Sequence, residues 1–238
     1  MMDYNFIVEG FKTPPHPKGI SLIGDKVRLE PLHAAKHAGP LFEANAIDAE
    51  GENWAYLPYG PFDTLESYQN WLADEAAKQD PTFFAILRQT DGKAVGVASC
   101  LRINQTDGSI EVGHIHYSPL LQRTREGTED MFLMMKWVFE NGYRRYEWKC
   151  NASNKKSRYA AQRLGFSYEG VFRQMSISKG RNRNTAWFAA IDKEWPSLKA
   201  CFDTYLADNN FNAYGKPKIS LSELTNPILY KLDNHEFI

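Results

Sequence analysis

The sequence lacks the features that mark a membrane-spanning or secreted protein. Its longest apolar run, residues 131–139, is nine residues long and is interrupted by Lys136. That run is too short to span a bilayer. Residues 1–10 include two acidic side chains and have neither the basic region nor the apolar region of a signal peptide. We therefore expect a cytoplasmic protein that contacts no membrane.

Cysteine is scarce as well. Cys100, Cys150 and Cys201 are the three in the chain, and no two of them form a CxxC pair. This spacing excludes zinc sites of the finger or ribbon type, so we expect no metal. Each cysteine is expected to act as a small buried hydrophobic residue in a reducing compartment.

Net charge is almost absent, but the charge is distributed unevenly. The 28 basic and 29 acidic residues give −1, which argues against bulk attraction to nucleic acid. Residues 144–183, however, hold eleven Lys or Arg and two Glu, a local balance of +9 that leaves −10 elsewhere. This basic segment predicts either a localised anionic ligand or a solvated, salt-bridged surface.

The chain has enough apolar material for one elaborated domain. Of 238 residues, 43% are hydrophobic and 13% are aromatic, which is typical of a folded protein. We expect an N-terminal leader at 1–24, a single domain at 25–208 and a C-terminal tail at 209–238. Proline and glycine exclude a regular helix from the leader, which should lie on the surface, and the tail should be loosely structured.

Hydrophobic periodicity predicts the element order strand, two helices, three strands, helix, strand, helix, two strands and a final helix. The expected strands cover 27–32, 83–87, 94–102, 109–117, 145–150, 168–177 and 186–191. The expected helices cover 33–46, 63–78, 126–141, 154–164 and 196–206. The segment 109–150 forms a crossover between parallel strands, which implies a mixed sheet with helices on both faces.

Four stretches within this order carry a family resemblance. They are EVGHIHYSP (111–119), QRTREGT (122–128), NASNKKSRYAAQRLGF (151–166) and GVFR (170–173). Together they resemble the GNAT acyl-CoA-dependent N-acetyltransferases, and within them the RimJ/RimL-like branch, over about residues 24–208. The resemblance implies an α/β (α+β) fold: a mixed, mostly antiparallel twisted sheet of about seven strands. The sheet would be splayed between its fourth and fifth strands.

The resemblance also implies that acetyl-CoA is the cosubstrate and that the loop before the helix at 126 binds its pyrophosphate. Backbone N–H groups at a helix N-terminus favour anions, so this use is physically sensible. Gln122 and Gly127 match the family pattern, whereas Arg125 stands where a glycine is usual and could donate to phosphate directly. The expected binding residues here are Gln122, Arg123, Thr124, Arg125, Gly127 and Thr128. An ordinary helix cap made by Thr124 or Thr128 is the alternative.

The helix at 154–164 is implied to meet the cofactor arm and the departing thiol. Asn154 would bond the pantetheine, and Ser157 or Tyr159 would donate to the thiolate. Tyrosine is the stronger acid of the two hydroxyls, while serine fits the position better. The alternative is that Asn154 only caps the helix and Ser157 is a first-turn residue.

The strand at 109–117 supplies the candidates for the base. The resemblance implies a carboxylate there that removes the amine proton through water, and Glu111 is ranked above His114 for this role. Strict alternation would place Glu111 and Tyr117 on one face and His114 and His116 on the other, although Gly113 suggests a bulge. His116 and Tyr117 are expected along the cofactor, where the strands splay.

Aromatic side chains are expected around the amine acceptor. Trp54, Tyr56 and Tyr59 lie in the loop between the first two helices, and Trp148 lies on the strand beside the splay. In the resembling fold this loop covers the acceptor site. The alternative is that these rings belong to the core, which is the commoner position for Trp and Tyr.

These features predict acetyl transfer from acetyl-CoA to a primary amine, by direct attack in a ternary complex and without a metal. The amine substrate would be a peptide N-terminus or a small molecule, and the protein would be a monomer or a homodimer. A non-catalytic acyl-CoA-binding sensor is one alternative, kept open by Arg125. The other is an RNA- or ribosome-binding protein that uses residues 144–183, although no signature of sequence-specific nucleic-acid recognition is present.

Overall fold

The computed structural model describes residues 6–234, which form an eight-stranded sheet with the order β1-β2-β3-β4-β5-β6-β8-β7. Neighbouring strands are antiparallel except for β5 and β6, which are parallel. The strands are β1 (Leu22–Ile23), β2 (Val27–Pro31), β3 (Thr82–Arg88), β4 (Ala94–Asn104), β5 (Ser109–Tyr117), β6 (Arg145–Asn151), β7 (Ser167–Ser178) and β8 (Arg181–Ile191). The expected mixed, mostly antiparallel sheet is confirmed.

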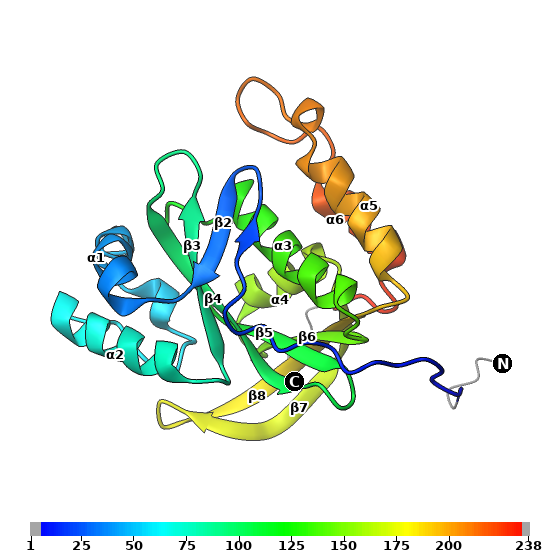
Figure 1. Ribbon diagram of the computed structural model, residues 1–238, viewed down its shortest axis with the longest axis horizontal. Coiled ribbons are helices and arrows are strands. Elements are labelled where there is room, and N and C mark those ends of the chain that lie inside the picture. The colour runs from blue at the N-terminus through cyan, green and yellow to red at the C-terminus, as the bar shows by residue number, and fades with distance from the viewer. Residues whose placement is uncertain (1–5, 235–238) are drawn as a thin grey trace.

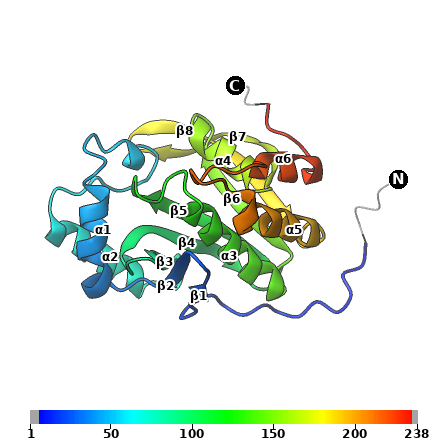
Figure 2. The same cartoon turned by 90° about the horizontal axis from the view of Figure 1, so that it is seen from above.

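Helices cover both faces of the sheet, as expected. Figures 1 and 2 show α1 and α2 on one side and α3, α4 and α5 on the other. The helices are α1 (Ala34–Asn45), α2 (Leu65–Ala77), α3 (Glu126–Glu140), α4 (Lys155–Arg163), α5 (Trp195–Leu206) and α6 (Leu221–Thr225), with 3-10 turns η1 (Glu52–Trp54), η2 (Asp208–Asn210) and η3 (Asn226–Ile228). The unit β5-α3-β6 is the crossover that the sequence predicts.

The sheet separates two hydrophobic clusters, and β3 contributes to both. Phe84 and Ile86 point into the larger cluster, beneath α3, α4 and α5. Phe83 and Leu87 point into the smaller cluster, beneath α1 and α2. Because successive side chains of a strand alternate between its faces, a wholly apolar strand of this kind is buried on both sides.

Three details of the elements differ from the expectations. The sheet, expected to have about seven strands, has eight, because Leu22–Ile23, in the expected leader, pairs with β2. Two residues are too few to show a period in the sequence. The β7–β8 turn is only Lys179–Gly180, since Arg181 already pairs with Ser178. The basic residues at 181–183 are therefore strand residues, not turn residues.

The third correction concerns the tail, which is ordered as far as it is described. A capping box at Ser220 and Glu223 begins α6. Farther on, the Asp233 carboxylate accepts two hydrogen bonds from the Arg158 guanidinium, at 2.6 and 2.7 Å, and both side chains are buried. The sequence of the tail does not predict the contact between Arg158 and Asp233, because a single ion pair produces no periodic pattern of apolar residues.

Candidate active site

The sheet opens between β5 and β6, where the family resemblance implies a splay. Their parallel pairing stops at Val112 and Trp148, although β5 continues to Tyr117 and β6 to Asn151. Beyond that point the facing backbone edges of the two strands diverge. A gap lined by unpaired strand edges is suited to an extended ligand, which can hydrogen-bond to the backbone.

A β-bulge re-aims the side chains of β5 just beyond the end of this pairing. Gly113 pairs with Ser99 and His116 pairs with Val97, so three steps along β5 match two along β4. His114 carries the bulge, with a φ of 50°. Gly113, which the sequence suggests for it, is not the residue in the left-handed conformation.

The bulge reverses the alternation of the strand. Before it, Val112 packs in the cluster beneath α3, and after it Tyr117 faces α3 and donates to the Asp130 carboxyl. Glu111 and Tyr117 therefore lie on opposite faces, not on one face as strict alternation predicts. One extra residue shifts every later side chain to the other side of a sheet.

The two histidines of β5 both pack against aromatic rings; His116 is buried and His114 is partly buried. His116 stacks on Trp54 with ring centroids 3.7 Å apart, and burial lowers its pKa to about 4. His114 stacks on Tyr59, and its Nδ1 lies 3.1 Å from the Tyr59 hydroxyl. Burial also lowers the pKa of His114, so both imidazoles are neutral at pH 7.

Glu111 is buried and ion-paired. Its Oε2 lies 2.8 Å from Lys149 Nζ and 2.7 Å from Arg102 Nη1. Burial raises the pKa of the Glu111 carboxyl, while the two cations act in the opposite direction. Lys149 also pairs with Glu147 at 2.7 Å. The sequence analysis missed Lys149, although its alternation with Glu147 along β6 places both on the face of Glu111.

The loop before α3 forms a tight turn that depends on Gly127. A Cβ at Gly127 would lie 2.5 Å from the Leu121 carbonyl oxygen, which no side chain tolerates. Thr124 accepts a hydrogen bond from the Gly127 N–H at 3.0 Å, so it caps the helix as the alternative interpretation expects. Capping and anion binding are compatible, because the cap uses only one of the N–H groups.

The other N–H groups of this turn remain available. Within residues 6–234, no acceptor lies against the backbone N–H of residues 123, 124, 125 or 126. Arg123 has a φ of 58°, which helps the turn to present these groups. A row of unsatisfied donors at the start of a 15-residue helix is a natural site for phosphate.

The remaining side chains of this loop hold it in place. Gln122 Nε2 donates to Asn53 at 2.7 Å and to the Tyr117 carbonyl at 2.9 Å. Arg125 pairs with Asp208 at 2.8 Å and stacks over Phe211. Its guanidinium thus joins the loop to the segment after α5.

Thr128 and the start of α4 lie on the far side of the loop. The buried Thr128 hydroxyl accepts from Arg163 at 2.9 Å. Asn154 caps α4 by accepting from the Ser157 N–H at 3.1 Å. The Ser157 hydroxyl in turn accepts from the Trp148 indole at 3.0 Å. Tyr159 is 56% exposed on the same helix.

The aromatic loop is part core and part surface. Trp54 is buried in the smaller cluster and Tyr59 packs against it, as the core alternative expects. Tyr56 is 43% exposed, and its hydroxyl donates to the Ser153 carbonyl just before α4. Lys179, at the tip of the β7–β8 hairpin, donates to the Trp54 carbonyl at 3.1 Å. Segments distant in sequence therefore meet around η1.

Two absences hold for the described part of the chain. Residues 6–234 contain no group of three or more His, Cys, Asp or Glu side chains arranged to hold a metal ion. No helix in the same range is long and apolar enough to cross a membrane.

A crossover helix whose N-terminus presents free N–H groups beside a splayed sheet is suited to an extended ligand with an anionic end. The family model of the GNAT acetyltransferase domain matches residues 26–167. The chain belongs to the GNAT acetyltransferase family, whose fold implies acetyl-CoA binding. No curated protein matches the sequence.

Solved structures agree with this assignment. A GCN5-related N-acetyltransferase from Brucella melitensis is 40% identical, with a TM-score of 0.89 over 92% of this chain and 100% of that one. A GNAT-family protein from Chromobacterium violaceum is 36% identical, with a TM-score of 0.75 over 82% and 98%. The microcin C7 self-immunity acetyltransferase MccE, solved with acetyl-CoA and AMP, is 18% identical, with a TM-score of 0.62 over 71% and 93%, and shares the fold.

Proposed function

We propose that this protein transfers the acetyl group of acetyl-CoA to a primary amine, on a peptide N-terminus or on a small molecule. The observation that carries the proposal is the turn at 121–127, where free backbone N–H groups lie at the start of α3 beside the β5–β6 splay. Acetyl-CoA supplies an acetyl group activated as a thioester. The amine nitrogen bonds to the acetyl carbon, the carbon–sulfur bond breaks, the nitrogen loses a proton and the sulfur gains one.

We assign the phosphate contacts to the backbone N–H groups at 123–126. Gly127 makes this turn possible, and Gln122 and Thr124 hold it in shape. Arg125 supports the turn through Asp208 and the segment after α5. The Arg125 departure from the family pattern is therefore compatible with cofactor binding, because its side chain points to a structural partner and its N–H remains free.

We assign proton removal from the amine to His114, with Glu111 as the alternative. The bulge aims His114 toward the face of the aromatic loop, where its ring is partly exposed and neutral. A neutral imidazole accepts a proton readily. Glu111 is already engaged with Lys149 and Arg102, and we assign it the role of neutralising those cations.

We assign stabilisation of the departing thiolate to Ser157, with Tyr159 as the alternative. The Trp148 indole fixes the Ser157 oxygen at the start of α4, beside the opening of the sheet. The Ser157 hydroxyl also interacts with the Cys150 thiol, and its proton would turn from that partner to the departing thiolate. We also place the chain in the RimJ/RimL-like branch, on the combined order and spacing of the four stretches at 111–119, 122–128, 151–166 and 170–173.

The first experiment measures acetyl-CoA binding and CoA release with a panel of amines. Gly127→Ala is expected to weaken acetyl-CoA binding by at least tenfold, because the added methyl group collides with the Leu121 carbonyl. Gly39→Ala, in α1 with open space around it, is the matched control. The control should bind acetyl-CoA as wild type does. Equal binding by both variants would contradict the assigned phosphate site, and binding without turnover by any amine would favour the sensor.

The second experiment identifies the base from kcat at saturating amine as a function of pH. The lowered pKa of His114 predicts a wild-type rate that falls only below pH 6.5, as the imidazole takes up a proton. His114→Gln should lower kcat by about 10²–10⁴ and remove this acidic limb. Glu111→Gln should keep the limb and lose stability, because Lys149 and Arg102 lose their carboxylate. The reverse pattern would assign the base to Glu111.

Several of the eleven cations in residues 144–183 are paired with carboxylates of the same chain. Arg145 pairs with Glu147 and Glu169, Lys149 with Glu111 and Glu147, and Arg158 with Asp233. Glu147 and Glu169 are already counted in the local balance of +9, so among these partners the two from outside the segment, Glu111 and Asp233, lower it only to +7. An anionic ligand at this segment therefore stays open.

A further inference from the structure

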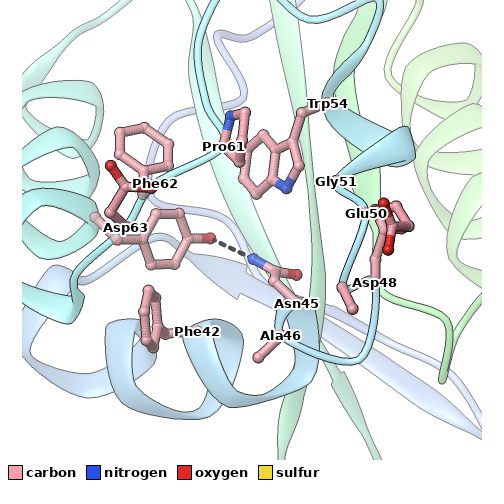
Figure 3. A pocket seen from close by; sticks show the side chains of 12 residues that line it. Phe42, Asn45, Ala46, Asp48, Glu50, Gly51, Trp54, Pro61, Phe62 and Asp63 are labelled. Carbon is pink, nitrogen blue, oxygen red and sulfur yellow. Dashed lines mark hydrogen bonds between the residues drawn. The ribbon is translucent and has the colours of Figure 1, made fainter.

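A second cavity lies behind Trp54, on the side of its indole that faces away from β5. Its volume is about 260 Å³, and the end of α1, η1 and the loop leading to α2 enclose it. Figure 3 shows Trp54, Asn45 and Phe62 turned toward it. A water occupies about 30 Å³ in the liquid, so the cavity has room for a small organic group rather than for a protein segment.

The cavity contains a buried acceptor that lacks a donor. Asn45 is 8% exposed, and its Nδ2 donates to the Tyr68 hydroxyl at 3.4 Å. Its Oδ1 has no partner within the described residues. Figure 3 shows this oxygen turned away from Tyr68, toward the space beneath Trp54. A buried carbonyl without a partner costs about 1–3 kcal/mol, and a ligand that donates an N–H would recover that cost.

The charges around the cavity are all negative. Asp48, Glu50 and Asp63 line it, and no lysine or arginine does. None of the three forms an ion pair within residues 6–234. Asp48 accepts only from the backbone N–H groups of Glu52 and Asn53. The lining thus offers three uncompensated carboxylates to a cation.

Aromatic rings complete the lining. Trp54, Phe42, Phe62 and Tyr68 all contribute to the wall. The faces of such rings attract ammonium groups, by about 0.5–2 kcal/mol each according to how far the group is desolvated. Rings, carboxylates and a buried amide oxygen together form a combination that recognises an organic ammonium ion.

The turn η1 links this cavity to the proposed reaction site. Trp54 stacks on His116 of β5, and the preceding residue, Asn53, binds the Tyr117 carbonyl and Gln122. A ligand in the cavity is therefore one aromatic ring away from the strand that borders the splay. We propose that the cavity binds a small organic diammonium ion, held by its three carboxylates, its rings and the Asn45 oxygen.

The test uses 1,4-diaminobutane as the probe, with n-butylamine and 1,4-butanediol as the singly charged and neutral comparisons. Binding is measured by calorimetry on the full-length protein without acetyl-CoA, so that the result does not depend on turnover. The diamine should bind at least tenfold more tightly than n-butylamine, and the diol should not bind. Equal binding of the diamine and the diol would overturn the proposal.

Two variants locate the binding. Asn45→Leu should weaken diamine binding by at least tenfold, and the surface variant Asp63→Asn by about threefold. Asp74→Asn, exposed on α2 and outside the lining, is the matched control and should bind as wild type does. If Asn45→Leu does not fold, Asp63→Asn still decides the result. Binding that neither pocket variant changes would overturn the proposal.

Because binding is measured without acetyl-CoA, its outcome does not depend on the proposed acetyl transfer. Failure of the pocket variants to change diamine binding would overturn the cation site and leave the transferase function in place.

Discussion

At the scale of single residues, the bulge at His114 has the largest consequences. It decides which side of the sheet each later side chain of β5 occupies, and so it places His116 beneath Trp54 and Tyr117 beside Asp130. Both contacts bury polar groups. Burial raises the pKa of Asp130 to about 8, so this carboxyl is protonated at pH 7 beside the Tyr117 hydroxyl.

Because His116 is buried, we expect the free energy of unfolding to fall in acid. Its pKa is about 4 in the folded protein and about 6.5 when unfolded, so the unfolded state binds the extra proton between these values. The contribution of His116 is complete above pH 6.5 and is lost as the pH falls toward 4. His116→Phe keeps an aromatic ring against Trp54. Between pH 6.5 and pH 4, its free energy of unfolding should fall by about 2 kcal/mol less than that of wild type.

The measurement is urea unfolding at pH 7 and at pH 4.5. His33→Gln, an exposed histidine at the start of α1, is the control and should follow wild type. A pH dependence for His116→Phe that equals that of wild type would show that the buried imidazole does not titrate as its surroundings require.

At the scale of elements, the tail segment after α5 secures α4. Asp233 and Arg158 form a buried ion pair directly beside Ser157 and Asn154 at the start of that helix. The Asp233 N–H also donates to Gln162 at 2.6 Å. The tail therefore helps to position the helix that we assign to the cofactor arm.

Removal of the Asp233 carboxylate is expected to destabilise the protein strongly. Asp233→Ala leaves the Arg158 charge buried, so the free energy of unfolding should fall by about 3–5 kcal/mol, and acetyl-CoA binding should weaken. Asp203→Ala removes the exposed i,i+4 pair with Lys199 and should cost about 0.5 kcal/mol or less. Chemical denaturation compares the two variants, and similar losses would mean that the tail does not anchor α4.

At the scale of the whole molecule, one sheet connects two hydrophobic clusters. Because β3 supplies side chains to both, neither cluster can lose its packing without disturbing the strand on which the other rests. We therefore expect a single cooperative unfolding transition, despite the length of the chain.

Adjacent phenylalanines test this cooperativity. Phe83→Ala opens the cluster beneath α1 and α2, and Phe84→Ala opens the cluster beneath α3. Each should lower the free energy of unfolding by about 3–5 kcal/mol. Far-ultraviolet circular dichroism and tryptophan fluorescence should report the same midpoint in both variants. Separated midpoints would show that the two clusters unfold independently.

The sequence by itself determined the order of the elements, the mixed sheet and the crossover at 109–150, because period, caps and turn residues are local signals. The family resemblance, through Gln122 and Gly127, also singled out the turn that we propose binds the pyrophosphate. Short or polar elements such as β1, the start of β8 and the tail could not be predicted from the sequence, since they have no periodic pattern of apolar residues.

Only the tertiary structure decided the direction and partners of the site residues. The bulge changes which face a side chain occupies, and the Arg125 side chain pairs with Asp208, a residue far from it in the sequence. Glu111 meets Lys149 across two parallel strands. The cavity behind Trp54 is made by α1, η1 and the loop to α2 together. Such contacts join residues far apart in the chain, and their energies depend on burial, which no local pattern encodes.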